Sequence, residues 1–151
     1  MNRLLQIALA LGVVSGFAIC AQSVISAGVG YMTQAKVMSE YKGVKLGMNR
    51  DAVKAALGNP ASASDTSDEF NLTGDDKMTV HYENGEVRAI QLAFSDPKNA
   101  PAWKEVVGDA EVSETSTGAK IARKIMEAEK FWVSIYQTKD GATTRITISR
   151  M

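Results

Sequence analysis

The stretch Ala52-Val53-Lys54-Ala55-Ala56-Leu57-Gly58-Asn59 has a counterpart 50 positions later, Ala102-Trp103-Lys104-Glu105-Val106-Val107-Gly108-Asp109. The first alanine, the lysine and the glycine coincide, and the apolar positions correspond. A unit repeated at a fixed offset is typical of a domain built twice from the same elements. The two blocks therefore predict two tandem units, at about residues 43–98 and 99–151.

Each block predicts a short helix. In the first, Asn49 can cap the helix, Val53 and Leu57 lie four positions apart on one face, and Gly58 follows where helices end. In the second, Asn99 and Pro101 are expected to open the helix and Gly108 to end it. The apolar face of this second helix is then Trp103, Val106 and Val107.

Three strands are expected after each helix. In the first unit they are residues 69–72, 77–82 and 87–94, and in the second they are 121–126, 131–137 and 143–150, with 111–115 as a possible extra strand. Segment 121–126 also suits a helix, and the parallel with the first unit favours a strand. The predicted fold class is α+β, an antiparallel sheet with short helices packed on one face.

The turn at Glu83-Asn84-Gly85 sets the register of one hairpin. A two-residue Asn84-Gly85 turn would pair Tyr82 with Val87 and put the two apolar rows of the strands on opposite faces. A three-residue loop would pair Tyr82 with Glu86 and bring both rows to one face. Because one face must be buried, we expect the three-residue loop.

Several of these segments resemble a known family. The run Gly43-Val44-Lys45-Leu46-Gly47-Met48-Asn49-Arg50-Asp51-Ala52-Val53, followed by Leu57-Gly58-Asn59-Pro60, resembles the opening of SmpA/OmlA (BamE-like) domains. Tyr82-Glu83-Asn84-Gly85 and Val87-Arg88-Ala89-Ile90 are similar to the hairpin of that family. The doubled unit resembles the tandem architecture of β-lactamase inhibitory proteins. The resemblance implies a cell-envelope role without catalysis, either in outer-membrane assembly or as an inhibitor of an exported enzyme.

The N-terminus is a predicted targeting or anchoring segment, residues 1–35, with an apolar helix. Arg3 precedes an uncharged stretch from Leu4 to Ala35, whose apolar core is long enough for a signal peptide or for one membrane span. Three fates stay open. They are an uncleaved anchor at about residues 4–26, cleavage near Ala21, Ser26 or Ala27, and acylation at Cys20 after a poor lipobox. In each case the domain at residues 36–151 is exported, to the periplasm or the cell surface.

Composition excludes several classes of site. From Lys36 onward the chain carries 16 basic and 17 acidic groups, so it has no general electrostatic attraction for nucleic acid. Cys20 is the only cysteine and His81 the only histidine, which excludes a structural zinc site with four such ligands. No phosphate-binding glycine loop or dinucleotide motif is present. We expect no cofactor, no metal and no small-molecule substrate.

His81 and an acidic cluster are the remaining candidates for chemistry. His81 is expected on the solvent-exposed sheet face beside Thr79 and Glu83, without the acid and nucleophile that catalysis requires. A small hydrolase using His81 is the remote alternative function. Five acidic residues lie around the first predicted strand: Asp65, Asp68, Glu69, Asp75 and Asp76. We expect them to form a solvated rim and not a calcium site.

One strand offers a candidate binding surface. If Phe131, Val133 and Ile135 form its buried row, the opposite face carries Trp132, Ser134 and Tyr136. Tryptophan and tyrosine are enriched in binding hot spots. The alternative is that these aromatic side chains belong to the core. The sequence thus predicts a non-catalytic envelope protein that binds another envelope protein, with Trp132, Tyr136 and Ser134 as possible partner-binding residues.

Overall fold

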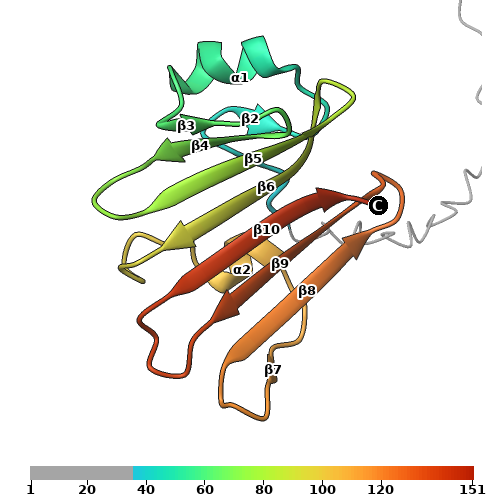
Figure 1. Ribbon diagram of the computed structural model, residues 1–151. Helices are drawn as coiled ribbons and strands as arrows, with labels where there is room; N and C mark the ends of the chain where they lie inside the picture. Colours follow the sequence, from blue (N-terminus) through green and yellow to red (C-terminus); the bar gives the residue numbers. More distant parts are fainter. Residues whose placement is uncertain (1–35) are drawn as a thin grey trace, which may run out of the picture. The chain divides into compact units, whose positions relative to one another are not determined.

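A computed structural model describes residues 36–151 of this chain. The anchor, cleavage and acylation expected for residues 1–35 lie outside the described residues. Within residues 36–151, no helix is both long enough and apolar enough to cross a membrane. Two short helices and an antiparallel sheet of eight strands confirm the α+β prediction (Figure 1).

The sheet contains two groups of four strands. The first group is β3 (Ser62–Ala63), β4 (Ser67–Asn71), β5 (Lys77–Glu83) and β6 (Glu86–Phe94). The second is β7 (Ser113–Glu114), β8 (Lys120–Met126), β9 (Phe131–Gln137) and β10 (Thr144–Arg150). The order across the sheet is β3-β4-β5-β6-β10-β9-β8-β7, so the last strands of the two groups pair antiparallel at its centre (Figure 1).

The prediction of three strands in each unit is wrong by one strand. Each group begins with a two-residue edge strand, β3 or β7, and β7 falls within the possible extra strand at 111–115. The ambiguous segment 121–126 is a strand, as predicted, within β8. A separate two-stranded hairpin, β1 (Glu40–Tyr41) and β2 (Val44–Lys45), precedes the sheet.

Helix α1 (Arg50–Leu57) begins and ends as predicted. The Asn49 side chain accepts a hydrogen bond of 2.8 Å from the backbone N–H of Ala52, which caps the helix. Gly58, at φ 84°, donates its N–H to the Lys54 carbonyl at 2.8 Å. Only glycine adopts this left-handed conformation without strain, so the glycine ends the helix.

Helix α2 (Trp103–Val107) starts later than predicted. Its N-cap residue is Ala102, whose N–H donates to Glu105 Oε2 at 3.2 Å. Asn99 does not cap the helix, because the helix begins only at Trp103; its side-chain amide donates to Asp76 Oδ2 at 2.8 Å. Gly108 ends α2, as predicted.

The core lies on one side of the sheet, called the core face here; the other side is the open face. Alternate residues of the strands are buried on the core face, together with Val53 of α1, Val106 and Val107 of α2, and Val44 of β2. Helix α2 lies against β8 and β9 (Figure 1). Among residues 36–151, both helices and β2 pack on the core face.

The β5–β6 hairpin corrects the predicted register. The turn is the two-residue Asn84-Gly85 type, with φ of 53° and 82°, and Tyr82 pairs with Val87. A β-bulge then shifts the register, so that His81 pairs with Ala89. The extra residue on β6 returns both apolar rows to the core face. Burial of the apolar rows therefore decides the register, as expected, but a bulge in β6 brings the rows together and a longer loop does not.

Truncating a core side chain of a central strand should destabilise the whole domain. Ile148 of β10 is fully buried, whereas its neighbour Thr147 lies on the open face. We expect Ile148→Ala to lower the free energy of unfolding by about 2–5 kcal/mol, because it leaves a cavity between the two strand groups. Thr147→Ala should change it by less than about 1 kcal/mol. Urea unfolding followed by circular dichroism measures both; equal losses would contradict the assignment of the two faces.

Candidate functional site

Strand β9 divides its side chains between the two faces of the sheet as the binding-surface hypothesis predicts. Phe131, Val133 and Ile135 are buried on the core face. Trp132, Ser134 and Tyr136 are half-buried on the open face. The aromatic residues therefore belong to the open face and not to the core.

The register of the sheet adds residues of β8 to this surface. Ile121 is opposite Tyr136, Arg123 is opposite Ser134, and Ile125 is opposite Trp132. Ile121 and Ile125 are 38% and 47% exposed, which is unusual for large aliphatic side chains. These six residues are called the β8–β9 patch: Ile121, Arg123, Ile125, Trp132, Ser134 and Tyr136.

Arg123 lies over the indole ring of Trp132. Its guanidinium carbon is 4.2 Å from the ring centroid, within the range of a cation–π contact. The contact holds the guanidinium against the sheet, between the two exposed isoleucines in the chain. The centre of the patch is thus a flat, cationic surface with aliphatic groups on either side.

The two halves of the open face differ in charge. On β4, β5 and β6, Lys77 pairs with Glu69 at 2.8 Å and Arg88 with Glu83 at 3.6 Å. On β8, β9 and β10 the open-face positions hold only two charged residues, Arg123 and Arg145. Neither forms an ion pair with a described residue. This half of the open face therefore carries a positive charge that no described acidic side chain neutralises.

Sequence reasoning found Trp132, Tyr136 and Ser134 but did not single out Ile121, Arg123 and Ile125. Their alternation around Ala122 and Lys124 was a weak signal. Only the pairing of β8 with β9 brings them beside the aromatic residues.

His81 lies on the open face, as predicted, opposite Ser67 on β4 and Ala89 on β6. It is less exposed than expected, because the side chain is half-buried and Nε2 is buried without a hydrogen-bond partner. No acid among the described residues therefore orients the ring through Nε2. In a Ser-His-Asp triad the nucleophile bonds to Nε2, and no described side chain makes that contact with His81.

The predicted solvated rim of acids is wrong for two of its members. Asp68 and Asp76 are buried, at 0% and 2% exposure. Strand β4 begins two residues earlier than predicted, and this places Asp68 on the core face. Asp76 accepts hydrogen bonds from the Ser95 N–H at 2.7 Å and from the Asn99 amide. Across residues 36–151, no group of three or more acidic, histidine or cysteine side chains is arranged to hold a metal ion.

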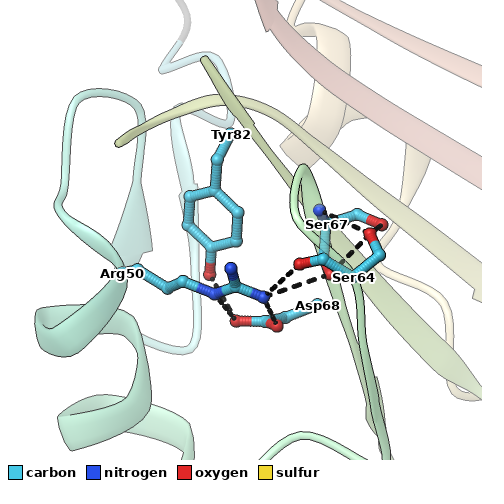
Figure 2. A network of polar contacts seen from close by, with 5 residues as sticks. All are labelled: Arg50, Ser64, Ser67, Asp68 and Tyr82. Atoms are coloured by element: carbon cyan, nitrogen blue, oxygen red, sulfur yellow. Dashed lines mark hydrogen bonds and ion pairs between the residues drawn. The ribbon is translucent and has the colours of Figure 1, made fainter. Parts of the chain in front are cut away.

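Asp68 is the centre of a buried polar network (Figure 2). Arg50, the first residue of α1, donates from Nε to Asp68 Oδ2 at 2.9 Å and from Nη2 to Oδ1. The hydroxyl of Tyr82 donates to Asp68 Oδ2 at 3.0 Å. Arg50 also lies over the Tyr82 ring, with its guanidinium carbon 5.1 Å from the centroid. Both oxygens of the carboxylate are therefore satisfied, as its burial requires.

A serine turn completes the network. Arg50 Nη2 donates to the Ser64 carbonyl at 2.6 Å, and the hydroxyls of Ser64 and Ser67 are 2.9 Å apart (Figure 2). The guanidinium thus joins α1 to the β3–β4 connection as well as to β4. Its five donors in a fixed plane suit this task better than a lysine ammonium would.

The contacts of the network shift the pKa values of its members. The hydrogen bond from Arg50 holds the pKa of the Asp68 carboxyl below its usual value, despite burial. Burial, followed by the bond to Asp68, raises the pKa of the Tyr82 phenol. Asp68 is therefore a carboxylate and Tyr82 a neutral hydrogen-bond donor at neutral pH. This arrangement binds secondary-structure elements together and leaves no reactive group free.

Removing the cation should destabilise the domain. Arg50→Ala leaves the buried Asp68 carboxylate without its charged partner, and we expect a loss of about 3 kcal/mol, the lower end for buried pairs because Arg50 is partly exposed. Lys77→Ala removes an exposed pair and should cost less than about 1 kcal/mol. Chemical denaturation of both variants compares the two losses, and a similar small loss for each would show that the network contributes little.

The lowered pKa of Asp68 predicts a loss of stability in acid. The folded state binds the Asp68 proton less tightly than the unfolded state does. The carboxylate therefore stabilises the fold above its pKa in the unfolded chain, about 4, and this stabilisation is lost as the pH falls through its lower pKa in the folded protein. We expect Asp68→Asn to be less stable at neutral pH and to lose less stability between neutral and acid pH. Urea titrations across that range test this, and parallel pH profiles for the two proteins would contradict it.

Comparisons with known proteins do not assign the chain to a family. No protein-family model matches the chain, and no curated protein matches its sequence. Among solved structures, the fold is similar to that of a cysteine-rich secretory protein from Staphylococcus aureus, with a TM-score of 0.44 and 8% identity over 78% of this chain. The chain spans about half of that protein, 49% of its length. The resemblance to SmpA/OmlA domains therefore stays an expectation from the sequence.

Proposed function

We propose that residues 36–151 form a non-catalytic domain of the cell envelope that binds another protein through the β8–β9 patch. The observation that carries this proposal is the composition of the patch. It presents a tryptophan, a tyrosine and an arginine, the three residue types most enriched in binding hot spots.

The geometry of the patch supports a protein partner. Its side chains stand on regular strands, so a partner does not have to order the backbone that carries them. Two exposed isoleucines border the Arg123–Trp132 stack and offer apolar area for burial. Exposed apolar groups gathered on one surface are typical of interaction sites.

The sequence supplies the cellular setting of the proposal. The leader pattern at residues 1–35 favours export, and the resemblance of residues 43–60 to SmpA/OmlA domains favours the envelope. Helix α1 is followed by strands β3 to β6, and helix α2 by strands β7 to β10. We interpret these two runs of one helix and four strands as a doubled unit. Its likeness to the tandem fold of β-lactamase inhibitory proteins belongs to this interpretation.

The absence of catalysis is also part of the proposal. It is supported by the local surroundings of His81, whose Nε2 is buried without a partner. It is further supported by the Arg50–Asp68–Tyr82 network, in which each polar group is used for structure.

The proposal predicts that Trp132→Ala and Tyr136→Ala together abolish partner binding without unfolding the domain. A photo-crosslinking amino acid placed at Ile121 of the full chain should form one dominant adduct in cells that export the protein. The double substitution should reduce this adduct at least tenfold, because hot-spot side chains each contribute about 2 kcal/mol or more. Mass spectrometry identifies the adduct, and thermal unfolding verifies the fold.

Gln91 provides the matched control for this experiment. It is exposed on the same open face but lies on β6, outside the patch. The crosslinker at Gln91 should give no such adduct. A large fall in the thermal stability of the double variant would show that Trp132 and Tyr136 stabilise the fold, and this would refute the proposal.

A further inference from the structure

The two outer edges of the sheet are closed to different extents. At the β4 edge, β3 pairs with Asp68 and Glu69, and the Ser64 N–H donates to the Ser67 carbonyl at 2.7 Å. At the β8 edge, β7 pairs only with Lys120 and Ile121. In the described residues, most of β8 therefore has a strand on one side only.

The direction of the backbone groups along β8 follows from its turn. The Thr115 N–H donates to the Ala119 carbonyl at 2.8 Å, so Ala119 directs its backbone groups towards β7. Successive residues of an antiparallel strand alternate in direction. Ile121, Arg123 and Ile125 therefore direct their N–H and C=O groups outward.

Of these three residues, only Ile121 has a neighbour on that side, Ser113 of β7. Arg123 and Ile125 pair with β9 at positions where their backbone groups point away from it. Among residues 36–151, neither forms a backbone hydrogen bond on the outer side. Two donors and two acceptors at this edge thus have no backbone partner in the described part of the chain, the arrangement to which a further strand can add.

The side chains of the same two residues face the patch. Ile125 is 47% exposed, and Arg123 is exposed with its guanidinium over Trp132. A strand added at this edge would place alternate side chains beside them, on the open face. Such a strand would extend the patch by one further row.

Charge decides which side chains fit. The open-face positions of β8, β9 and β10 contain two arginines and no acid. Opposite charges on neighbouring strands stabilise a sheet, and like charges destabilise it. The position beside Arg123 therefore favours a carboxylate, and the position beside Ile125 favours an apolar side chain.

We propose that the partner adds an extended segment to the outer edge of β8 at Arg123–Ile125, with a carboxylate beside Arg123 and an apolar side chain beside Ile125. This inference rests on the proposed function and specifies how the partner binds. Main-chain hydrogen bonds supply affinity in such strand addition, and the alternate side chains supply specificity.

The test uses the full chain in detergent and a defined probe, the capped peptide Thr-Glu-Thr-Val-Thr-Glu-Thr-Val-Thr. Amide hydrogen exchange followed by NMR should show at least tenfold slower exchange at Arg123 and Ile125 when the peptide is bound. A peptide with lysine in place of each glutamate should bind at least tenfold more weakly. Protection elsewhere on the domain, or equal binding of both peptides, would overturn the proposal.

Two substitutions separate the backbone and charge contributions. Ile125→Pro removes an outward N–H that β9 does not use, so the domain should stay folded and bind the glutamate peptide at least tenfold more weakly. Arg123→Glu should reverse the preference in favour of the lysine peptide. Asn71→Pro, which removes an outward N–H at the β4 edge, is the control and should bind as the unaltered chain does.

The outcomes also distinguish this inference from the proposed function. If Trp132→Ala with Tyr136→Ala abolishes the cellular adduct while Ile125→Pro leaves it intact in a folded protein, the partner binds the patch alone and strand addition is wrong. If Arg123→Glu fails to exchange the preference between the two peptides, the charge assignment is wrong.

Discussion

Burial of a single sheet face is the constraint on which the rest of this structure depends. Short elements pack against one side of the eight strands, and they contribute Val53 of α1, Val106 and Val107 of α2, and Val44 of β2 to the core. Alternation then assigns every second side chain to the open face. The bulge in β6 shows how strong the constraint is, because the chain accepts an irregular strand to keep both apolar rows on the core face.

Local signals made much of this fold predictable, and long-range pairing accounts for what was missed. Asn49 and Gly58 mark α1 through contacts within a few residues, and the alternation in β9 locates its strand and both its faces. The β6 bulge, in contrast, depends on which turn the hairpin adopts. The burial of Asp68 depends on Arg50, 18 positions earlier, and no periodicity reveals such a pair. Likewise, the surface around Trp132 was only half predictable, since Ile125 joins it through sheet register.

The two polar features of the domain have opposite roles because their surroundings differ. Asp68 is fully buried, and Arg50 and Tyr82 satisfy its charge, so removing Arg50 or Asp68 leaves an unpaired polar group inside the protein. Arg123 stands on the open face against Trp132, where water still reaches it. A charge of the first kind fixes the fold, whereas a charge of the second kind remains free to select what approaches the surface.

The pairing of β6 with β10 has a consequence for how the molecule is made. These two strands join the halves of the sheet, yet in the chain β10 follows β6 only after α2 and the strands β7, β8 and β9. Until β10 has been synthesised, residues 89–94 of β6 lack their sheet partner on that side, and contacts between such distant segments form late and slowly. An incomplete chain therefore exposes a long apolar strand edge, which favours aggregation. A chaperone that protects this edge until β10 emerges would relieve the hazard, and a chain that lacks β10 would retain it permanently.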